Sequence, residues 1–416
     1  MDSRTRPYGL INRNLFFFML AMMLANIGSS MYAPLLPLYL KEMGASVAQI
    51  GLYFTVAQFV PLLLQVLGGW VSDSIGRLRG VVLGSVAGNL GFIGFLLAPT
   101  WQWMLIGEFF HALNYSLVGP SYAAYVADQS SDRQRGRTFG FTEMMVVLVG
   151  VIGPPLGGWL AHRFGFRLML LVAWTFYFLA TLIRVVMSHR AWTSGKLPMK
   201  PLHLADLWAN MKTLNRVMLA GGLIIWLIGV YSLFEISNSM STSLMPLFAE
   251  EIGGMNFQQI GLLGAIFGLS TMVGNLPGGW LADKRGEQIG IAFGLLLQAA
   301  GLVGFVQAGN FGGYALGWIL FGLGGGMMSP AFDTLISRAV PAGLRGTAYG
   351  MFNATVGLAA MPAPAINAQL WQRISPRFPF VLGVLVSLFG IIPALFKLKR
   401  PTLPPGGQDL PVHRNE

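Results

Sequence analysis

Long apolar runs dominate this sequence and recur along its whole length, with short polar connections between most of them. A helix that crosses a bilayer needs roughly 20 mostly apolar residues. Only 10% of the residues are charged, against about 25% in an average soluble domain. Runs of sufficient length occur at residues 15–39, 47–71, 80–98, 101–126, 138–161, 166–188, 217–247, 257–281, 288–308, 312–336, 347–370 and 378–397. The sequence therefore predicts an all-α integral membrane protein with 12 transmembrane helices.

Lysines and arginines are distributed unevenly between the two sides that 12 spans would define. Cytoplasmic loops of membrane proteins carry an excess of these residues. Of the 27 in this chain, only five fall on the side opposite the termini, namely Lys41, Arg163, Arg167, Arg373 and Arg377. Both termini are therefore expected in the cytoplasm, and the protein is expected to be a multi-pass protein of the cell (inner) membrane.

Several function classes are disfavoured by the composition. The net charge of +11 is spread over short loops, which does not suit a nucleic-acid-binding face. There are no cysteines, and the five histidines lack metal-ligand spacing, so neither a metal site nor a cofactor is expected. No ATP-binding loop and no nucleophile–base arrangement is present, so we predict neither an ATP-driven pump nor an enzyme.

The two halves of the sequence repeat one another at a constant offset of 210 residues. The recurring pairs include Ile50-Gly51 with Ile260-Gly261, Gly107 with Gly317, Pro120 with Pro330, and Arg135-Gly136 with Arg345-Gly346. Parallel repeats of this kind are typical of transporters whose substrate path lies between two lobes. We predict six-helix lobes at 1–190 and 217–400, and a cytoplasmic linker with an amphipathic helix at 191–216. Residues 401–416 are predicted to form a disordered cytoplasmic tail.

The connection between the second and third spans carries a pattern of small, acidic and basic residues. Its members are Gly69, Asp73, Gly76, Arg77 and Arg79, and a shorter copy in the second half contains Gly279, Asp283 and Arg285. This pattern resembles the signature loop of the major facilitator superfamily, and the resemblance covers nearly the whole chain. It implies the major facilitator fold and a cytoplasmic gate, in which the loop stabilises the state closed to the cytoplasm. Ser74 and Leu78 depart from the family pattern.

The fifth span carries glycines and prolines at close spacing, at Gly140, Gly153, Pro154, Gly157 and Gly158. Such residues allow a membrane helix to bend and to approach its neighbours. The arrangement is similar to the exporter motif of the 12-span drug/proton antiporter branch, with Val149 in place of one glycine. The resemblance implies export, and helix packing without directional meaning is the alternative.

Ionisable residues inside spans are costly, by about 2.5–3.5 kcal/mol on insertion scales, and are functional candidates for that reason. Glu108 and His111 are three residues apart and share one helix face, where they could form a hydrogen bond and exchange protons. Glu235 lies within a polar run of the seventh span. We predict these three as proton-coupling residues, the alternative for the first two being a structural ion pair. The family often has an arginine where Glu108 stands, so its role is not carried over.

The resemblance also implies that spans 1, 4, 7 and 10 line a central cavity. The predicted substrate-cavity residues on these spans are Asn26, Tyr32, Tyr115, Tyr231, Phe234, Asn238, Met327 and Phe332. Methionine and aromatic side chains adapt to varied apolar ligands. The same residue types are also common in the lipid-facing surface or core of membrane proteins, so the pattern alone leaves both interpretations open.

Together these features predict a secondary active transporter that exports a small amphipathic or hydrophobic molecule, by proton antiport with alternating access. An uptake symporter or facilitator for a small polar metabolite, and a lipid or lysolipid flippase, are the alternatives. The expected partners are a small-molecule substrate, protons as the coupling ion and the lipid bilayer. The absence of long loops and soluble domains favours a monomer.

Overall fold

A computed structural model of the chain describes residues 13–129, 135–193, 222–339 and 345–398. In these residues the structure consists of helices with no strand. The predicted amphipathic linker helix and the predicted tail lie outside the described residues. The described part of the chain is therefore an all-α membrane fold, as predicted.

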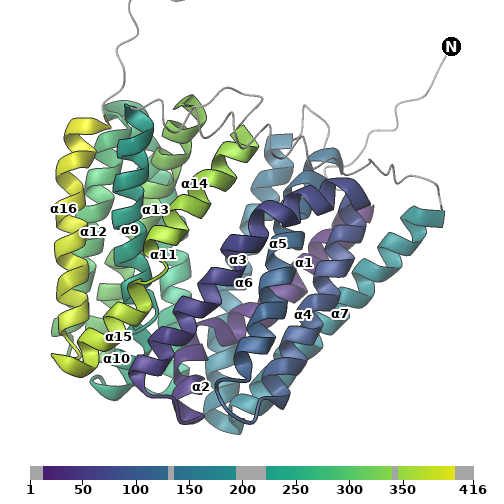
Figure 1. The fold of residues 1–416 in the computed structure, drawn as a ribbon, viewed down its shortest axis with the longest axis horizontal. Helices are drawn as coiled ribbons and strands as arrows, with labels where there is room; N and C mark the ends of the chain where they lie inside the picture. Colours follow the sequence, from purple (N-terminus) through teal and green to yellow (C-terminus); the bar gives the residue numbers. More distant parts are fainter. Residues whose placement is uncertain (1–12, 130–134, 194–221, 340–344, 399–416) are drawn as a thin grey trace, which may run out of the picture.

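The helices form two groups that follow the two halves of the sequence (Figure 1). The first half contains α1 (Arg13–Tyr32), η1 (Ala33–Leu35), α2 (Leu36–Glu42), α3 (Val47–Ile75), α4 (Arg77–Leu97), α5 (Met104–Gln129), α6 (Arg135–Phe164) and α7 (Phe166–Thr193). The second half contains α9 (Leu223–Thr242), α10 (Met245–Glu251), α11 (Phe257–Arg285), α12 (Glu287–Gln307), α13 (Phe311–Ala339), α14 (Arg345–Ala360), α15 (Ala363–Arg373) and α16 (Phe378–Lys397). We call these two groups the N lobe and the C lobe.

Ten segments of the described chain are long and apolar enough to cross a membrane. The predicted fourth span corresponds to α5, a continuous helix that carries polar residues such as Glu108 and Asn114. The predicted span at 347–370 is not one continuous helix, because it is divided between α14 and α15 at Pro362. Proline lacks the backbone N–H that a continuous helix requires, which explains the break.

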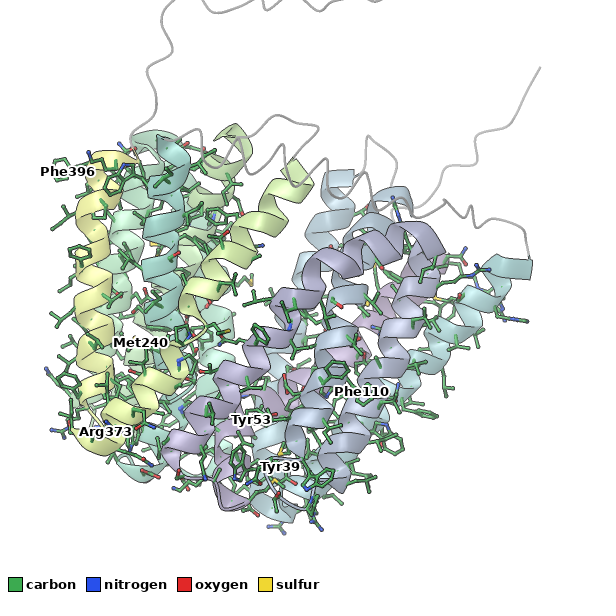
Figure 2. All side chains as sticks on the ribbon, viewed as in Figure 1. Tyr39, Tyr53, Phe110, Met240, Arg373 and Phe396 are labelled. Atoms are coloured by element: carbon green, nitrogen blue, oxygen red, sulfur yellow. The ribbon has the colours of Figure 1, made fainter. Side chains whose placement is uncertain are left out.

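Proline also divides the first and seventh predicted spans near their ends. Pro34 and Pro37 separate α1 from the short helix α2, and Pro246 lies at the start of α10. Both short helices lie at the same end of the molecule as α15 (Figure 1). Tyr39 and Arg373 lie at this end, whereas Phe396 lies at the other (Figure 2).

The sequence repeat appears in the structure as repeated local geometry. Ser46 and Gln49 form a capping box at the start of α3, and Asn256 and Gln259, each 210 residues later, form the same box at the start of α11. Each of these helices ends at a glycine with positive φ, +92° at Gly76 and +99° at Gly286. A residue with a side chain rarely adopts this backbone conformation, so glycine is required at both turns.

Two contacts between the lobes are also related by the repeat. Gly51 of α3 packs against the backbone carbonyl of Pro364 in α15, and Gly261 of α11 packs against the carbonyl of Pro154 in α6. A methyl group on either glycine would overlap that carbonyl oxygen. The two lobes are therefore in backbone contact at two equivalent places. These places lie near the starts of α3 and α11, at residues 47 and 257.

The contacts between lobes lie towards one end of the molecule, which we call the closed end. There the Ala365 backbone N–H of α15 donates to the Thr55 hydroxyl of α3 (3.1 Å), across the boundary between the lobes. At the opposite end, where α16 finishes, the two groups of helices diverge (Figure 1). In this part, Gly274 and Gly278 of α11 pack on α13 within their own lobe.

Candidate functional site

A cavity of about 380 Å³ lies between the two lobes. Its wall combines Phe54 and Gln58 of α3 and Pro154 of α6 with residues of the C lobe, among them Phe267 and Trp318. A cavity of this size lies within the range for sites that bind small molecules. Because both lobes contribute to the wall, any movement of one lobe against the other changes the cavity.

The wall of this cavity is mostly apolar. Its polar members, apart from the indole of Trp318, are Ser30, Gln58, Ser239, Thr242 and Ser243. Among the described residues that line it, none is an aspartate, glutamate, lysine, arginine or histidine. The Gln58 amide donates to the Ser239 hydroxyl (3.1 Å), which joins the two lobes across the cavity.

None of the eight predicted cavity residues lines this cavity. Three of them form an aromatic cluster inside the C lobe, where the Tyr231 ring lies 4.5 Å from that of Phe332 and 5.6 Å from that of Phe234. Met327 is buried against Gly278 of the same lobe. These four residues therefore have packing roles in this conformation, and their contact with a substrate stays a prediction.

The other four predicted cavity residues are scattered. Tyr32 packs edge-on against the rings of Phe92 and Phe95 in the N lobe. Asn26 lines a much smaller void of about 10 Å³, and Tyr115 is 69% exposed. The Asn238 backbone carbonyl accepts a hydrogen bond from Thr242.

Glu108 is held by a neighbouring helix rather than by His111. The Tyr53 hydroxyl of α3 donates to the Glu108 carboxylate (3.2 Å). No hydrogen bond joins Glu108 and His111 in the described structure, so the predicted contact between them is not formed. Tyr53 is fully buried, in the half of the molecule that contains the closed end (Figure 2). Its ring is 5.6 Å from that of Phe54, a wall residue of the cavity, so the side chains of Tyr53 and Phe54 lie between Glu108 and the cavity.

His111 is buried among aromatic rings. Its imidazole lies 5.0 Å from the Phe92 ring and 4.9 Å from the Phe95 ring. Its Nε2 atom has no hydrogen-bond partner among the described residues. The packing against Gly91 turns the imidazole towards α4, which explains why it does not meet Glu108.

The polar run that contains Glu235 divides between two faces of α9. Ser237 bonds to the Gly383 carbonyl (3.0 Å) and the Ser387 hydroxyl (2.8 Å) of α16, whereas Ser239 reaches the cavity. Glu235 itself is half-buried and does not line the cavity. Asp333 of α13, which sequence reasoning did not single out, is an exposed acid within a predicted span.

Arg184 was counted in the sequence analysis only among the basic residues on the cytoplasmic side. It is 1% exposed inside the N lobe, where it donates to the Ser85 hydroxyl (2.7 Å) and the Ala21 carbonyl (3.5 Å). No acidic side chain forms an ion pair with it in the described structure. Arg184 lies well inside the apolar run 166–188, whose other arginine, Arg167, is at its first turn, and this position was the signal that indicated burial.

The predicted cytoplasmic gate is only partly described. The side chains of Gly69 and Asp73 lie outside the described residues, as do the surroundings of Gly140. Arg77 and Arg79 are half-buried at the start of α4, Gly279 is half-buried in α11, and Asp283 and Arg285 are exposed at its end. Among the described residues, no ion pair connects the second copy to the N lobe, and its gating role stays a prediction.

The predicted exporter motif of the fifth span is part of the helix contacts of α6. Gly153 packs against Ser30, and Gly157 against the Met31 carbonyl, both in α1. Gly158 packs against the Phe257 carbonyl of the C lobe. The motif thus brings α6 close to its own lobe and to the other, which agrees with the packing interpretation and leaves the direction of transport open.

An ion-pair cluster joins the lobes at the closed end. Lys41 of α2 lies 2.6 Å from Glu250 and 2.9 Å from Glu251 of α10. All three side chains are about one-third exposed. Sequence reasoning treated Lys41 only as one of the few basic residues outside the cytoplasmic side. The 210-residue repeat makes its position equivalent to that of Glu251.

Comparison with known proteins places these features in a family. A profile of the Major Facilitator Superfamily matches residues 18–253 and, again, residues 227–412. The multi-drug resistance efflux pump PmrA homolog of Lactococcus lactis is 26% identical over 395 residues, covering 91% of this chain and 93% of the relative. Quinolone resistance protein NorA of Staphylococcus aureus (strain MRSA252) is 22% identical over 400 residues, covering 93% of this chain and 97% of the relative.

Solved structures with the same fold include a peptide transporter POT in complex with sulfate, with a TM-score of 0.76 and 15% identity. That match covers 94% of this chain and 95% of the transporter. A bacterial homolog of the human lysosomal transporter Spinster, in an inward-facing and unoccupied conformation, has a TM-score of 0.74, again at 15% identity. It matches over 92% of this chain and 96% of its own. At this identity the likeness concerns the fold.

Proposed function

Because this chain belongs to the Major Facilitator Superfamily, we propose that it exports small amphipathic or hydrophobic molecules by proton antiport with alternating access. The observation that carries the proposal is the apolar cavity between the lobes, with the Glu108 carboxyl bonded to Tyr53, which neighbours the wall residue Phe54. The names of the relatives, a multi-drug efflux pump and a quinolone resistance protein, favour efflux of a small organic compound.

The conformation suits a carrier that opens to the cytoplasm. The distribution of basic residues assigns the end opposite the closed end to the cytoplasm. The closed end, with Lys41 and its two glutamates, then faces outward. A substrate would enter the cavity from the cytoplasmic side or from the inner leaflet, and would leave when the outer contacts separate.

Glu108 is the residue to which we assign proton coupling. It belongs to the N lobe, whose buried polar contacts include those of Arg184 with Ser85 and of Tyr177 with Asn114. A charged carboxylate favours the Tyr53 hydroxyl as its donor, and protonation weakens that preference. Tyr53 precedes Phe54 in α3, so proton binding to Glu108 shifts Tyr53 and with it Phe54 in the cavity wall. A bound substrate that displaces Phe54 acts on the Glu108 carboxyl through the same two side chains.

We assign the exchange step to a rocking movement of the two lobes about the cavity. Opening of the outer side breaks the ion pairs of Lys41 and the close contacts of Gly51 and Gly261. On the inner side, the loop after α3 and its copy after α11 approach one another and close the cytoplasmic entrance. The Asp and Arg residues of these loops are then the groups that hold the entrance closed.

The proposal is tested by proton release from energised everted membrane vesicles on addition of lipophilic cations and neutral amphiphiles. We expect proton movement that depends on the compound in the wild-type protein and is absent in Glu108→Gln. Glu235→Gln should keep the response, because Glu235 does not line the cavity. No response to any compound, with folded protein in the membrane, would exclude proton-coupled export.

A further inference from the structure

Gln58 and Ser239 form a hydrogen bond between the lobes at the wall of the cavity. The Gln58 amide of α3 donates to the Ser239 hydroxyl of α9 (3.1 Å), and both residues line the cavity. Phe54 precedes Gln58 by four residues and lies in the same wall, so one face of α3 borders the cavity. This bond is therefore a place where a ligand can meet both lobes at once.

The other polar groups of the wall have no donor that a ligand can reach. Three hydroxyl groups already donate to backbone carbonyls three or four residues earlier in the chain, namely those of Ser30 (3.0 Å), Thr242 (2.8 Å) and Ser243 (2.9 Å). The Nε1 atom of Trp318 is buried. Donors for a ligand are therefore those of Gln58 and Ser239.

The Gln58 side chain keeps both a donor and an acceptor for a ligand. A carboxamide has two N–H donors and one carbonyl acceptor, and the bond to Ser239 uses one N–H. In the described structure the Oε1 atom of Gln58 has no hydrogen-bond partner and is not buried, so a ligand can reach it. A half-turn of the amide exchanges its carbonyl with its N–H groups and still leaves a donor and an acceptor free. The site is thus complementary to a group that also carries both.

This bond departs from the repeat. The position equivalent to Gln58 in the second half is Gly268, which has no side chain. The position equivalent to Ser239 in the first half is Ser29, whose hydroxyl donates within its own helix (3.2 Å). The backbone contacts of the closed end recur in both halves, but this bond does not. The wall therefore has one polar edge, at Gln58 and Ser239, and is otherwise mostly apolar.

We propose that the cavity recognises an uncharged amide group of its substrates, and that Gln58 and Ser239 hold this group from the two lobes. The amide takes the place of the Gln58–Ser239 bond, because its carbonyl accepts from one residue and its N–H donates to the other. The ligand thus replaces one direct bond between the lobes by two bonds through itself. The inference rests on the proposed export function, since it names the polar group by which that function selects its substrates.

Three uncharged two-ring compounds of similar shape test the inference. Benzanilide carries an amide N–H and carbonyl, phenyl benzoate carries an ester with acceptors only, and trans-stilbene carries neither. An ester offers no donor, so the Gln58 carbonyl loses its water without a replacement. Equilibrium binding of each radiolabelled compound is measured on the purified full-length protein, without a proton gradient. We expect saturable binding of benzanilide, binding of phenyl benzoate weaker by about three- to tenfold, and still weaker binding of trans-stilbene.

Gln58→Met removes the amide and keeps an unbranched side chain. It should weaken binding of benzanilide by about three- to tenfold, remove most of the preference over phenyl benzoate, and leave trans-stilbene unchanged. Ser239→Ala should weaken benzanilide in the same way. Gln102→Met, at an exposed glutamine outside the cavity lining, is the matched control and should change none of the three affinities. The thermal unfolding midpoint of each variant verifies that it is folded.

Equal binding of the three compounds, an unchanged preference for benzanilide in Gln58→Met, or no saturable binding of any compound would each overturn the inference. An equal loss of affinity for all three compounds in Gln58→Met would also overturn it, because that result indicates a general change of the cavity. Binding is measured without a gradient and is independent of proton coupling. Binding as expected together with no proton release in vesicles would therefore refute the antiport proposal and leave the ligand class standing.

Discussion

Lys41 and Glu251 occupy equivalent positions of the two repeats, 210 residues apart, and form an ion pair of 2.9 Å between the lobes. The repeat relates the two short helices α2 and α10, so their equivalent residues approach one another at the closed end. Opposite charge at the two positions converts this approach into an attraction. In the proposed transport cycle, the pair forms only while the outer end is closed.

Reversal of the charge at Lys41 should weaken the outer closure. A partly exposed ion pair contributes little, so we expect Lys41→Glu to raise access to the cavity from outside by about two- to fivefold. The chain has no cysteines, so a Thr242→Cys background reports access as its labelling rate with a membrane-impermeant maleimide on intact cells. Addition of Glu250→Lys and Glu251→Lys should restore slow labelling. A labelling rate that is the same in all of these charge variants would refute the role of the pair.

Close backbone contact at Gly261 should be necessary for the closed end. Gly261→Ala places a methyl group against the Pro154 carbonyl, and backbone cannot move aside as a flexible side chain can. We expect about tenfold faster outside labelling of the same cysteine. Gly304→Ala is the matched control, because a methyl group there meets no atom within 4 Å. Equal labelling rates in the two variants would contradict this assignment.

Removal of the Tyr53 hydroxyl should uncouple the carboxyl from the cavity without destroying the site. Tyr53→Phe keeps the ring beside Phe54 and loses the bond to Glu108. We expect unchanged binding of benzanilide and a proton release per bound substrate that falls several-fold. Phe54→Leu, which alters the wall directly, should instead weaken binding. A normal proton response in Tyr53→Phe would show that the route through this hydroxyl is not used.

Arg184 should matter for stability rather than for transport chemistry. Its guanidinium is buried and bonds to the Ser85 hydroxyl and the Ala21 carbonyl, so Arg184→Ala leaves a cavity and two groups without their donor. We expect the thermal unfolding midpoint to fall by several degrees. Lys284→Ala, at an exposed residue over the Trp280 ring, should change it little. Similar midpoints for both variants would indicate that Arg184 has no structural role.

The fold was largely predictable from the sequence, because the hydrophobic length of a span and the loop charges are local properties. The spans and the 210-residue repeat needed only the order of residues. The breaks at Pro362 and Pro34 show where local rules were applied incompletely, since proline near a span end marks a separate short helix.

The cavity lining was not predictable in the same way. In a membrane helix, an apolar residue suits the lipid, the core and an apolar cavity equally well, so Phe332 and Trp318 could not be assigned to different surroundings by type. Their positions depend on the packing of two lobes far apart in the sequence. The repeat offered one unused signal, because it places Trp318 at the position of Glu108, which had already been selected as functional.

The most direct test of the account uses proteoliposomes that contain the purified protein and carry a pH gradient without a membrane potential. Two quantities are measured on addition of benzanilide, the proton flux and the exchange of labelled for unlabelled substrate. The account predicts both in the wild-type protein, and only the exchange in Glu108→Gln. Proton flux that persists in Glu108→Gln, or exchange that is lost together with the flux while binding remains, would contradict it.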